Sequence, residues 1–162
     1  MDALEGWSEF NVAMVGATAA LAGLVIVAAS VNIAEIVKAA TITSRLGAAI
    51  AALVLALTAS ALALVPSITA PVLGGCVLGA AVVAGWFQLH ASVVIARDPS
   101  PEDQARMIKA VFGFLPIAAY LVAGVLLFVD PIAGLIAAAV GSLVAIVTAL
   151  VVSWVALVEV LR

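Results

Sequence analysis

Long uncharged runs of apolar residues constrain this chain more than any other feature. From Phe10 to Val37 the only charged side chain is Glu35, and four more apolar runs follow. A helix needs about 20 apolar residues to cross a bilayer. Hydrophobic residues make up 67% of the chain and charged residues 9%, which is more apolar surface than a soluble domain of this length can bury. We expect an all-α integral membrane bundle, one transmembrane domain over residues 1–162.

Residues that break helices set the boundaries of the predicted spans. Pro66 ends the second run and Asp130-Pro131 separates the last two, because proline cannot continue a helical hydrogen-bond ladder. Ser100, followed by a proline and two acids, is typical of a helix start. Pro116 lies inside the fourth span and is expected to bend it. The five predicted spans are residues 7–37, 46–65, 72–96, 104–129 and 132–161.

All basic residues fall on one side of the membrane if the chain crosses it five times. They are Lys38, Arg45, Arg97, Arg106, Lys109 and Arg162. If the chain crossed only four times, the basic residues would fall on both sides of the membrane. By the positive-inside rule this side is cytoplasmic, so the N-terminus is expected outside and the C-terminus inside. No basic segment precedes the first run, so we expect no cleavable signal peptide.

The first span has two specialised faces on opposite sides of the helix. Steps of three and four residues, which follow one side of a helix, gather most of its polar side chains into one row. We name this the polar row: Asn11, Met14, Thr18, Leu21, Val25, Ala28, Asn32 and Glu35. The opposite, small row is Ala13, Gly16, Ala20, Gly23, Val27, Ser30 and Ala34. Small residues let helices approach closely, whereas polar ones either bond to a neighbouring helix or line an aqueous path.

Glycines at helical spacing predict close helix contacts in the later spans as well. Gly75 and Gly79 form such a pair in the third span, and Gly134 and Gly141 lie on one seam of the last. Glycine at these positions removes the side chain that would keep two helices apart.

A small group of polar residues is expected in the cytoplasmic half of the membrane. The five-span topology puts Gln88 and His90 of the third span at the same depth as Asn32 and Glu35. A buried histidine beside a carboxylate titrates near neutral pH and serves as a gate or proton relay. The alternative is a structural histidine that is hydrogen-bonded to a backbone carbonyl. Basic residues of the cytoplasmic loops are expected to contact the headgroups of membrane lipids.

Several classes of function are excluded. One cysteine and one histidine permit neither an internal disulfide nor a two-histidine or cysteine-based metal site. The net charge of −3 argues against nucleic-acid binding. The chain has no phosphate-binding glycine-rich loop, no metalloprotease histidine pair and no nucleophile elbow. We expect no enzyme, no metal and no cofactor.

The first span also carries a recognisable motif. The run Gly16-Ala-Thr-Ala-Ala-Leu-Ala-Gly-Leu24, followed by Ser30-Val-Asn32, resembles the first helix of a functionally uncharacterised group of small bacterial inner-membrane proteins. That group carries Gly-x-Ser-Ala-Ala-Leu-x-Gly-Leu and then Ser-x-Asn, and Thr18 stands here where serine is usual. The resemblance implies a multi-pass protein of the bacterial inner (plasma) membrane and implies no activity.

Three functions fit these observations, the first two better than the third. The first is a homo-oligomeric channel or pore for ions or small solutes, in which the polar row surrounds a central pathway. Asn11, Thr18 and Asn32 would then form polar rings, the apolar members of the row a constriction that gates by dewetting, and Glu35 a ring that favours cations. The alternative is a non-enzymatic accessory or assembly subunit whose polar row docks on another membrane protein. A third interpretation is a lipid-binding or small transport protein that works as a monomer or dimer.

Overall fold

The computed structural model describes residues 4–97 and 103–160, and these ranges contain helices and short connections without a strand. The elements are a 3-10 turn Glu5–Trp7, α1 Ser8–Val31, α2 Ile33–Ile36, α3 Ala40–Ala63, α4 Ala70–Ala96, α5 Asp103–Val129 and α6 Pro131–Val160. Five of the helices, all but α2, are long and apolar enough to cross a membrane. The prediction of helices without strands is confirmed for the described residues, and five of these helices are candidates to cross a membrane, as expected of a multi-pass membrane protein.

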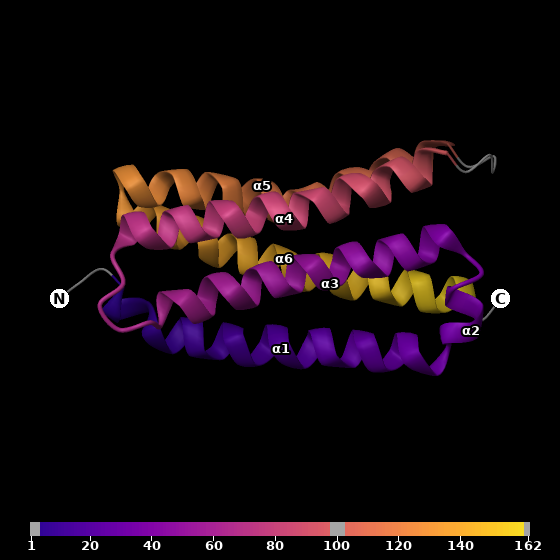
Figure 1. Cartoon of the computed structure of the whole chain (residues 1–162), viewed down its shortest axis with the longest axis horizontal. Helices are drawn as coiled ribbons and strands as arrows, with labels where there is room; N and C mark the ends of the chain where they lie inside the picture. The colour runs from indigo at the N-terminus through magenta and orange to yellow at the C-terminus, as the bar shows by residue number, and fades with distance from the viewer. Residues whose placement is uncertain (1–3, 98–102, 161–162) are drawn as a thin grey trace.

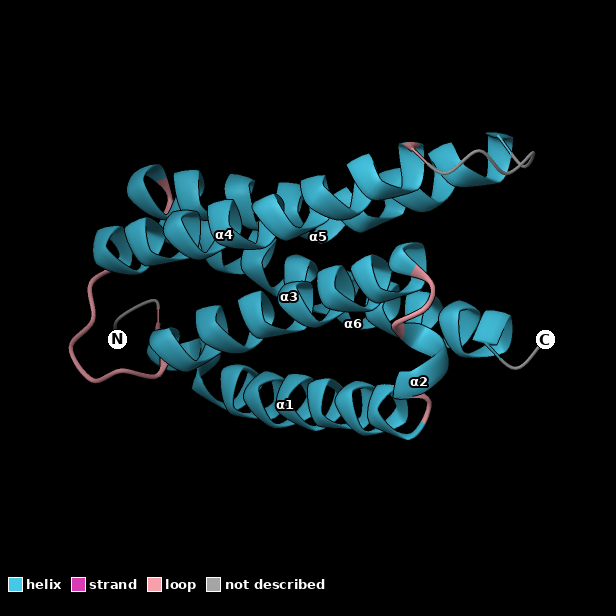
Figure 2. Ribbon diagram, turned by 45° about the vertical axis from the view of Figure 1, so that its right-hand side comes forward, coloured by secondary structure: helices cyan, strands magenta, loops and turns pink. Residues whose placement is uncertain are grey.

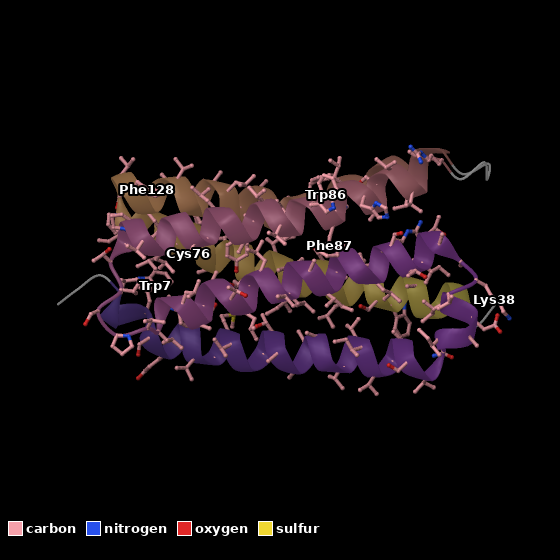
Figure 3. All side chains as sticks on the ribbon, in the orientation of Figure 1. Trp7, Lys38, Cys76, Trp86, Phe87 and Phe128 are labelled. Carbon is pink, nitrogen blue, oxygen red and sulfur yellow. The ribbon has the colours of Figure 1, made fainter. Side chains whose placement is uncertain are left out.

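The five long helices run roughly along one axis, and their order in space differs from their order in sequence. α3 and α6 lie in the middle, α1 packs on both of them, and α4 and α5 pack together on the other side (Figures 1 and 2). Glu9 and Asp130 lie at one end of the bundle, here called the acidic end. Lys38, Arg45 and Arg97 lie at the opposite, basic end. Trp7 and Lys38 mark the two ends in Figure 3.

Large apolar side chains cover the outer surface of the bundle. Trp86 of α4 and Trp154 of α6 are 72% and 71% exposed, and many valines, leucines and phenylalanines are exposed around them. A helix that is apolar on its outer as well as its inner face needs lipid as its solvent. The exposed apolar surface therefore agrees with the multi-pass membrane protein that the five long helices indicate.

Small residues form most of the helix contacts in the interior. Gly74 of α4 lies against the backbone of Gly124 of α5, and Gly134 of α6 lies against the backbone of Leu127. Gly141 packs against the ring of Tyr120, which is fully buried. The predicted packing role of Gly134 and Gly141 agrees with these contacts.

The other four predicted packing glycines make no such contact within the chain. A Cβ atom placed on Gly16, Gly23, Gly75 or Gly79 would meet nothing within 4 Å. The close contact predicted at the Gly75 and Gly79 pair is not made within this chain, so the packing role of these glycines, like that of Gly16 and Gly23, stays a prediction. The face of α4 that packs on α5 includes Gly74 and is turned by one residue from the face that carries Gly75 and Gly79.

The connection between the first two spans is shorter than predicted. α1 ends at Val31, because the Asn32 side chain donates to the Ala28 carbonyl at 3.2 Å and the Asn32 backbone leaves the helical region. α3 begins at Ala40 instead of Leu46, and the Thr43 hydroxyl bonds to the Ile36 carbonyl of α2 at 2.8 Å. The predicted spans leave the polar residues 38–45 in a loop, whereas residues 40–45 form the first turns of α3. The predicted helix start at Ser100 lies outside the described residues.

Candidate functional site

The polar row of α1 faces the interior of its own chain. Asn11, Thr18 and Val25 are its buried members, with Thr18 fully buried. α1 contacts α3 and α6, and the Thr18 hydroxyl donates to the Met14 carbonyl of its own helix at 2.6 Å. Asn11, Thr18 and Val25 therefore pack on neighbouring helices of the same chain, which is the alternative to lining an aqueous path. In this arrangement they do not line a pathway between copies.

The last members of the polar row lie at the basic end and meet solvent rather than a neighbouring helix. Glu35 is exposed and forms an ion pair with Lys38, with 2.8 Å between Oε1 and Nζ. An exposed pair of this kind stabilises a fold by about 0–1 kcal/mol. Glu35 therefore lies on the surface of the single chain.

The four polar residues expected at one depth do not all meet within one chain. Gln88 is buried, whereas His90 is exposed on the outer side of α4. α4 packs on α3 and α5, and α3 separates it from α1, which carries Asn32 and Glu35 (Figure 1). The sequence leaves open whether His90 lies close to Glu35, and within this chain the two residues belong to helices that do not pack on each other.

A cavity of about 580 Å³ lies between α3, α4, α5 and α6, in the half of the bundle near the basic end. Drug-sized ligands occupy pockets of about 300–1,000 Å³. Its floor is α3, where Ala48, Ala49 and Ala52 share one side of the helix, and Ala91 of α4 forms part of the wall. These methyl groups are too short to fill the space between the helices. The cavity is the result of small residues on facing helices.

One side of this cavity opens to the outer surface between α5 and α6. Phe112 and Leu115 of α5 and Leu143, Val147 and Val151 of α6 line the cavity and are also exposed. Residues that are both lining and exposed mark the mouth. The mouth lies along helices that are apolar enough to cross a membrane.

Few polar side chains line the cavity. Gln88 and Thr148 are both buried, and Arg45 is the one charged residue among the described lining residues. The Gln88 amide lies against Gly113 of α5, at a place where any Cβ atom would overlap it. Glycine at position 113 therefore leaves the room that the Gln88 side chain occupies.

Arg45 and Thr148 were missed as site residues. The predicted spans leave Arg45 in a loop. It lies three, four and seven residues before Ala48, Ala49 and Ala52, and residues at these spacings share one side of a helix. That spacing was the available signal. Nothing in the neighbourhood of Thr148 along the chain points to a cavity.

Comparison with protein-family models, with curated proteins and with solved structures gives no match for this chain. The resemblance of the first span to a bacterial family therefore stays an expectation. Among the residues that the structure describes, no group of three or more His, Cys, Asp or Glu side chains is placed to hold a metal ion.

Proposed function

We propose that this protein binds a membrane lipid with an anionic headgroup, with an acyl chain in the cavity between α3, α4, α5 and α6. The observation that carries this proposal is the cavity itself. It is large, mostly apolar and open between α5 and α6, and Arg45 is the cationic side chain among its described lining residues.

The apolar part of the site matches an acyl chain. Alanines of α3 and valines of α6 offer no hydrogen bonds, so the cavity suits a ligand without polar atoms along its length. The mouth between α5 and α6 lets such a chain enter sideways from the bilayer. Each methylene group that leaves water for an apolar environment contributes about 0.8 kcal/mol, but a lipid already in the bilayer gains little from this term. Selectivity must therefore come from shape and from the headgroup.

Arg45 provides the headgroup contact in this proposal. It lies in the second turn of α3, at the basic end, where a lipid headgroup would lie if its chain occupied the cavity. A guanidinium group is always charged and donates two parallel hydrogen bonds to phosphate oxygens. We further propose that the basic end is cytoplasmic and the N-terminus outside. The cavity is then in the inner leaflet of a plasma membrane, whose surface carries anionic lipids.

The channel and the accessory subunit stay predictions. Three of the residues proposed to line a channel, Asn11, Thr18 and Val25, are buried within their own chain, so a pore between copies would require another lining or another arrangement. The small row of α1 remains exposed, and association of copies through it stays a prediction too.

Native mass spectrometry of the protein released from nanodiscs tests the lipid site. Nanodiscs with equal parts of phosphatidylglycerol and phosphatidylcholine should yield protein that retains phosphatidylglycerol. Ala48→Phe fills the cavity from its floor and should remove most of the bound lipid. Ala20→Phe adds the same volume on the exposed side of α1 and should leave it unchanged. Equal lipid retention by the two variants would contradict the proposal.

A further inference from the structure

A second, much smaller cavity lies near the acidic end of the bundle. It measures about 20 Å³ and is lined by side chains of α1, α3, α4, α5 and α6 and by Trp7. Four polar residues line it: Asn11, Ser60, Tyr120 and Ser142. A cavity needs at least about 10–15 Å³ to hold a water molecule, so this one has room for a single water.

The hydrogen bonds around this cavity leave one acceptor available. The Ser142 hydroxyl donates to the Ala138 carbonyl at 3.2 Å. Its single proton is thereby used, so in the 2.7 Å contact between Tyr120 Oη and Ser142 Oγ the tyrosine is the donor. Tyr120 Oη keeps its accepting capacity, and its side chain is fully buried. Tyr120 Oη can therefore accept one more hydrogen bond from a nearby donor.

Asn11 supplies the matching unsatisfied donor. Only 7% of Asn11 is exposed, and its Nδ2 atom is buried without a hydrogen-bond partner. Buried amide groups nearly always have a partner, because an unmade hydrogen bond is costly to the folded state. Asn11 and Tyr120 line the same cavity, and Asn11 Nδ2 has no direct bond to Tyr120 Oη. A partner that both accepts and donates would satisfy both atoms.

We propose that this cavity binds one water molecule. The water accepts a hydrogen bond from Asn11 Nδ2 and donates one to Tyr120 Oη, and the Ser60 hydroxyl is its third neighbour. Buried waters typically make about three hydrogen bonds to groups that would otherwise be unsatisfied. The water links α1 to α5, which have no extensive direct packing, and through Ser142 to α6. This site lies at the opposite end from the lipid cavity and does not depend on the proposed function.

A crystal structure grown in a lipidic phase, at a resolution that shows ordered water, tests the site directly. We expect a density peak at hydrogen-bonding distance, about 2.7–3.2 Å, from both Asn11 Nδ2 and Tyr120 Oη. An empty cavity between these atoms would overturn the proposal.

Equilibrium unfolding of Asn11→Leu in mixed micelles gives an independent test. A site with water and a site without it predict different changes in the stability of this variant. If a water bridges Asn11, the apolar variant should lower the ratio of folded to unfolded protein about threefold or more. If the amide is merely unsatisfied, leucine of similar size should leave this ratio unchanged or raise it, which would overturn the proposal. Thr18→Val is the control, since the Thr18 hydroxyl bonds only within its own helix.

A double-mutant cycle with Tyr120→Phe separates the water from a general packing effect. The phenylalanine lacks the acceptor, so Asn11→Leu should cause a smaller loss in this background than in the wild-type protein. Equal losses in both backgrounds would show that the two residues are not bridged.

Discussion

Gly74 of α4 and Gly124 of α5 face each other so closely that a Cβ atom on Gly74 would lie 2.8 Å from the Gly124 carbonyl oxygen. The same Cβ would also lie 3.1 Å from the Cβ of Leu127. Both obstacles are held by the α5 backbone and cannot rotate away. This contact holds α4 against α5 near the acidic end, away from the large cavity.

Gly74→Ala is therefore expected to destabilise the protein by about 1–3 kcal/mol, the usual cost of overpacking a close contact. Gly75→Ala is the matched control, because its Cβ would meet nothing within 4 Å. Alanine is the better helix former by about 1 kcal/mol, so this variant should be neutral or slightly stabilised. Unfolding in mixed micelles, followed by circular dichroism, measures both. Similar stability of the two variants would place the contact elsewhere.

Arg45→Gln is expected to weaken the preference for phosphatidylglycerol over phosphatidylcholine about tenfold, since a charge-assisted hydrogen bond is worth about 1.5–3 kcal/mol. Lys38→Gln removes the same charge at the same end of the bundle, but Lys38 is exposed and pairs with Glu35 outside the cavity. Lipid exchange followed by native mass spectrometry measures the preference. If both variants lose it equally, the headgroup is attracted by the net charge of this end and not by the cavity.

Asp130→Ala should shorten or loosen the start of α6. Asp130 Oδ1 accepts hydrogen bonds from the Ile132 and Ala133 backbone N–H groups at 3.1 and 3.2 Å, which caps the helix. Loss of such a cap costs about 0.5–2 kcal/mol. Asp130→Asn keeps an accepting oxygen and should retain most of the stability, as measured by thermal unfolding. A larger loss with asparagine than with alanine would argue against the cap.

The proposed orientation predicts which connections can be labelled from outside the cell. In a Cys76→Ser background, Ser67→Cys lies in the exposed link between α3 and α4, at the same end as Glu9, and should react with a membrane-impermeant maleimide. Lys38→Cys, at the basic end, should react only after the cells are permeabilised. The reverse pattern would invert the topology and place the lipid cavity in the outer leaflet.

The sequence was sufficient for the helices and for which residues share a side, but not for what each side faces. Periodicity placed Asn11, Thr18 and Val25 in one row correctly, since it depends only on the geometry of a single helix. Whether that row meets water, lipid or α3 depends on how the helices pack. For the same reason the chain order gave no hint that α6, the last helix, packs on α3 and α1.

The sites were less predictable because they are made by several helices together. The large cavity exists only where alanines of α3 and α4 face valines of α6, and these residues are far apart in the chain. Tyr120 and Ser142 were each visible as polar residues, yet their bond joins positions 22 residues apart on two helices. In the absence of homologous sequences or structures, pairings of this kind follow from three-dimensional packing alone.

The sideways mouth between α5 and α6 has a consequence for how the large cavity would be filled. A lipid that reaches it by lateral diffusion never crosses water, so the relevant concentration is its mole fraction in the surrounding leaflet. Occupancy would then follow the composition of the membrane and not the amount of any solute. Transfer into detergent dilutes the ligand and the competitors alike, so the purified protein would represent the membrane from which it was taken only while lipid is still present.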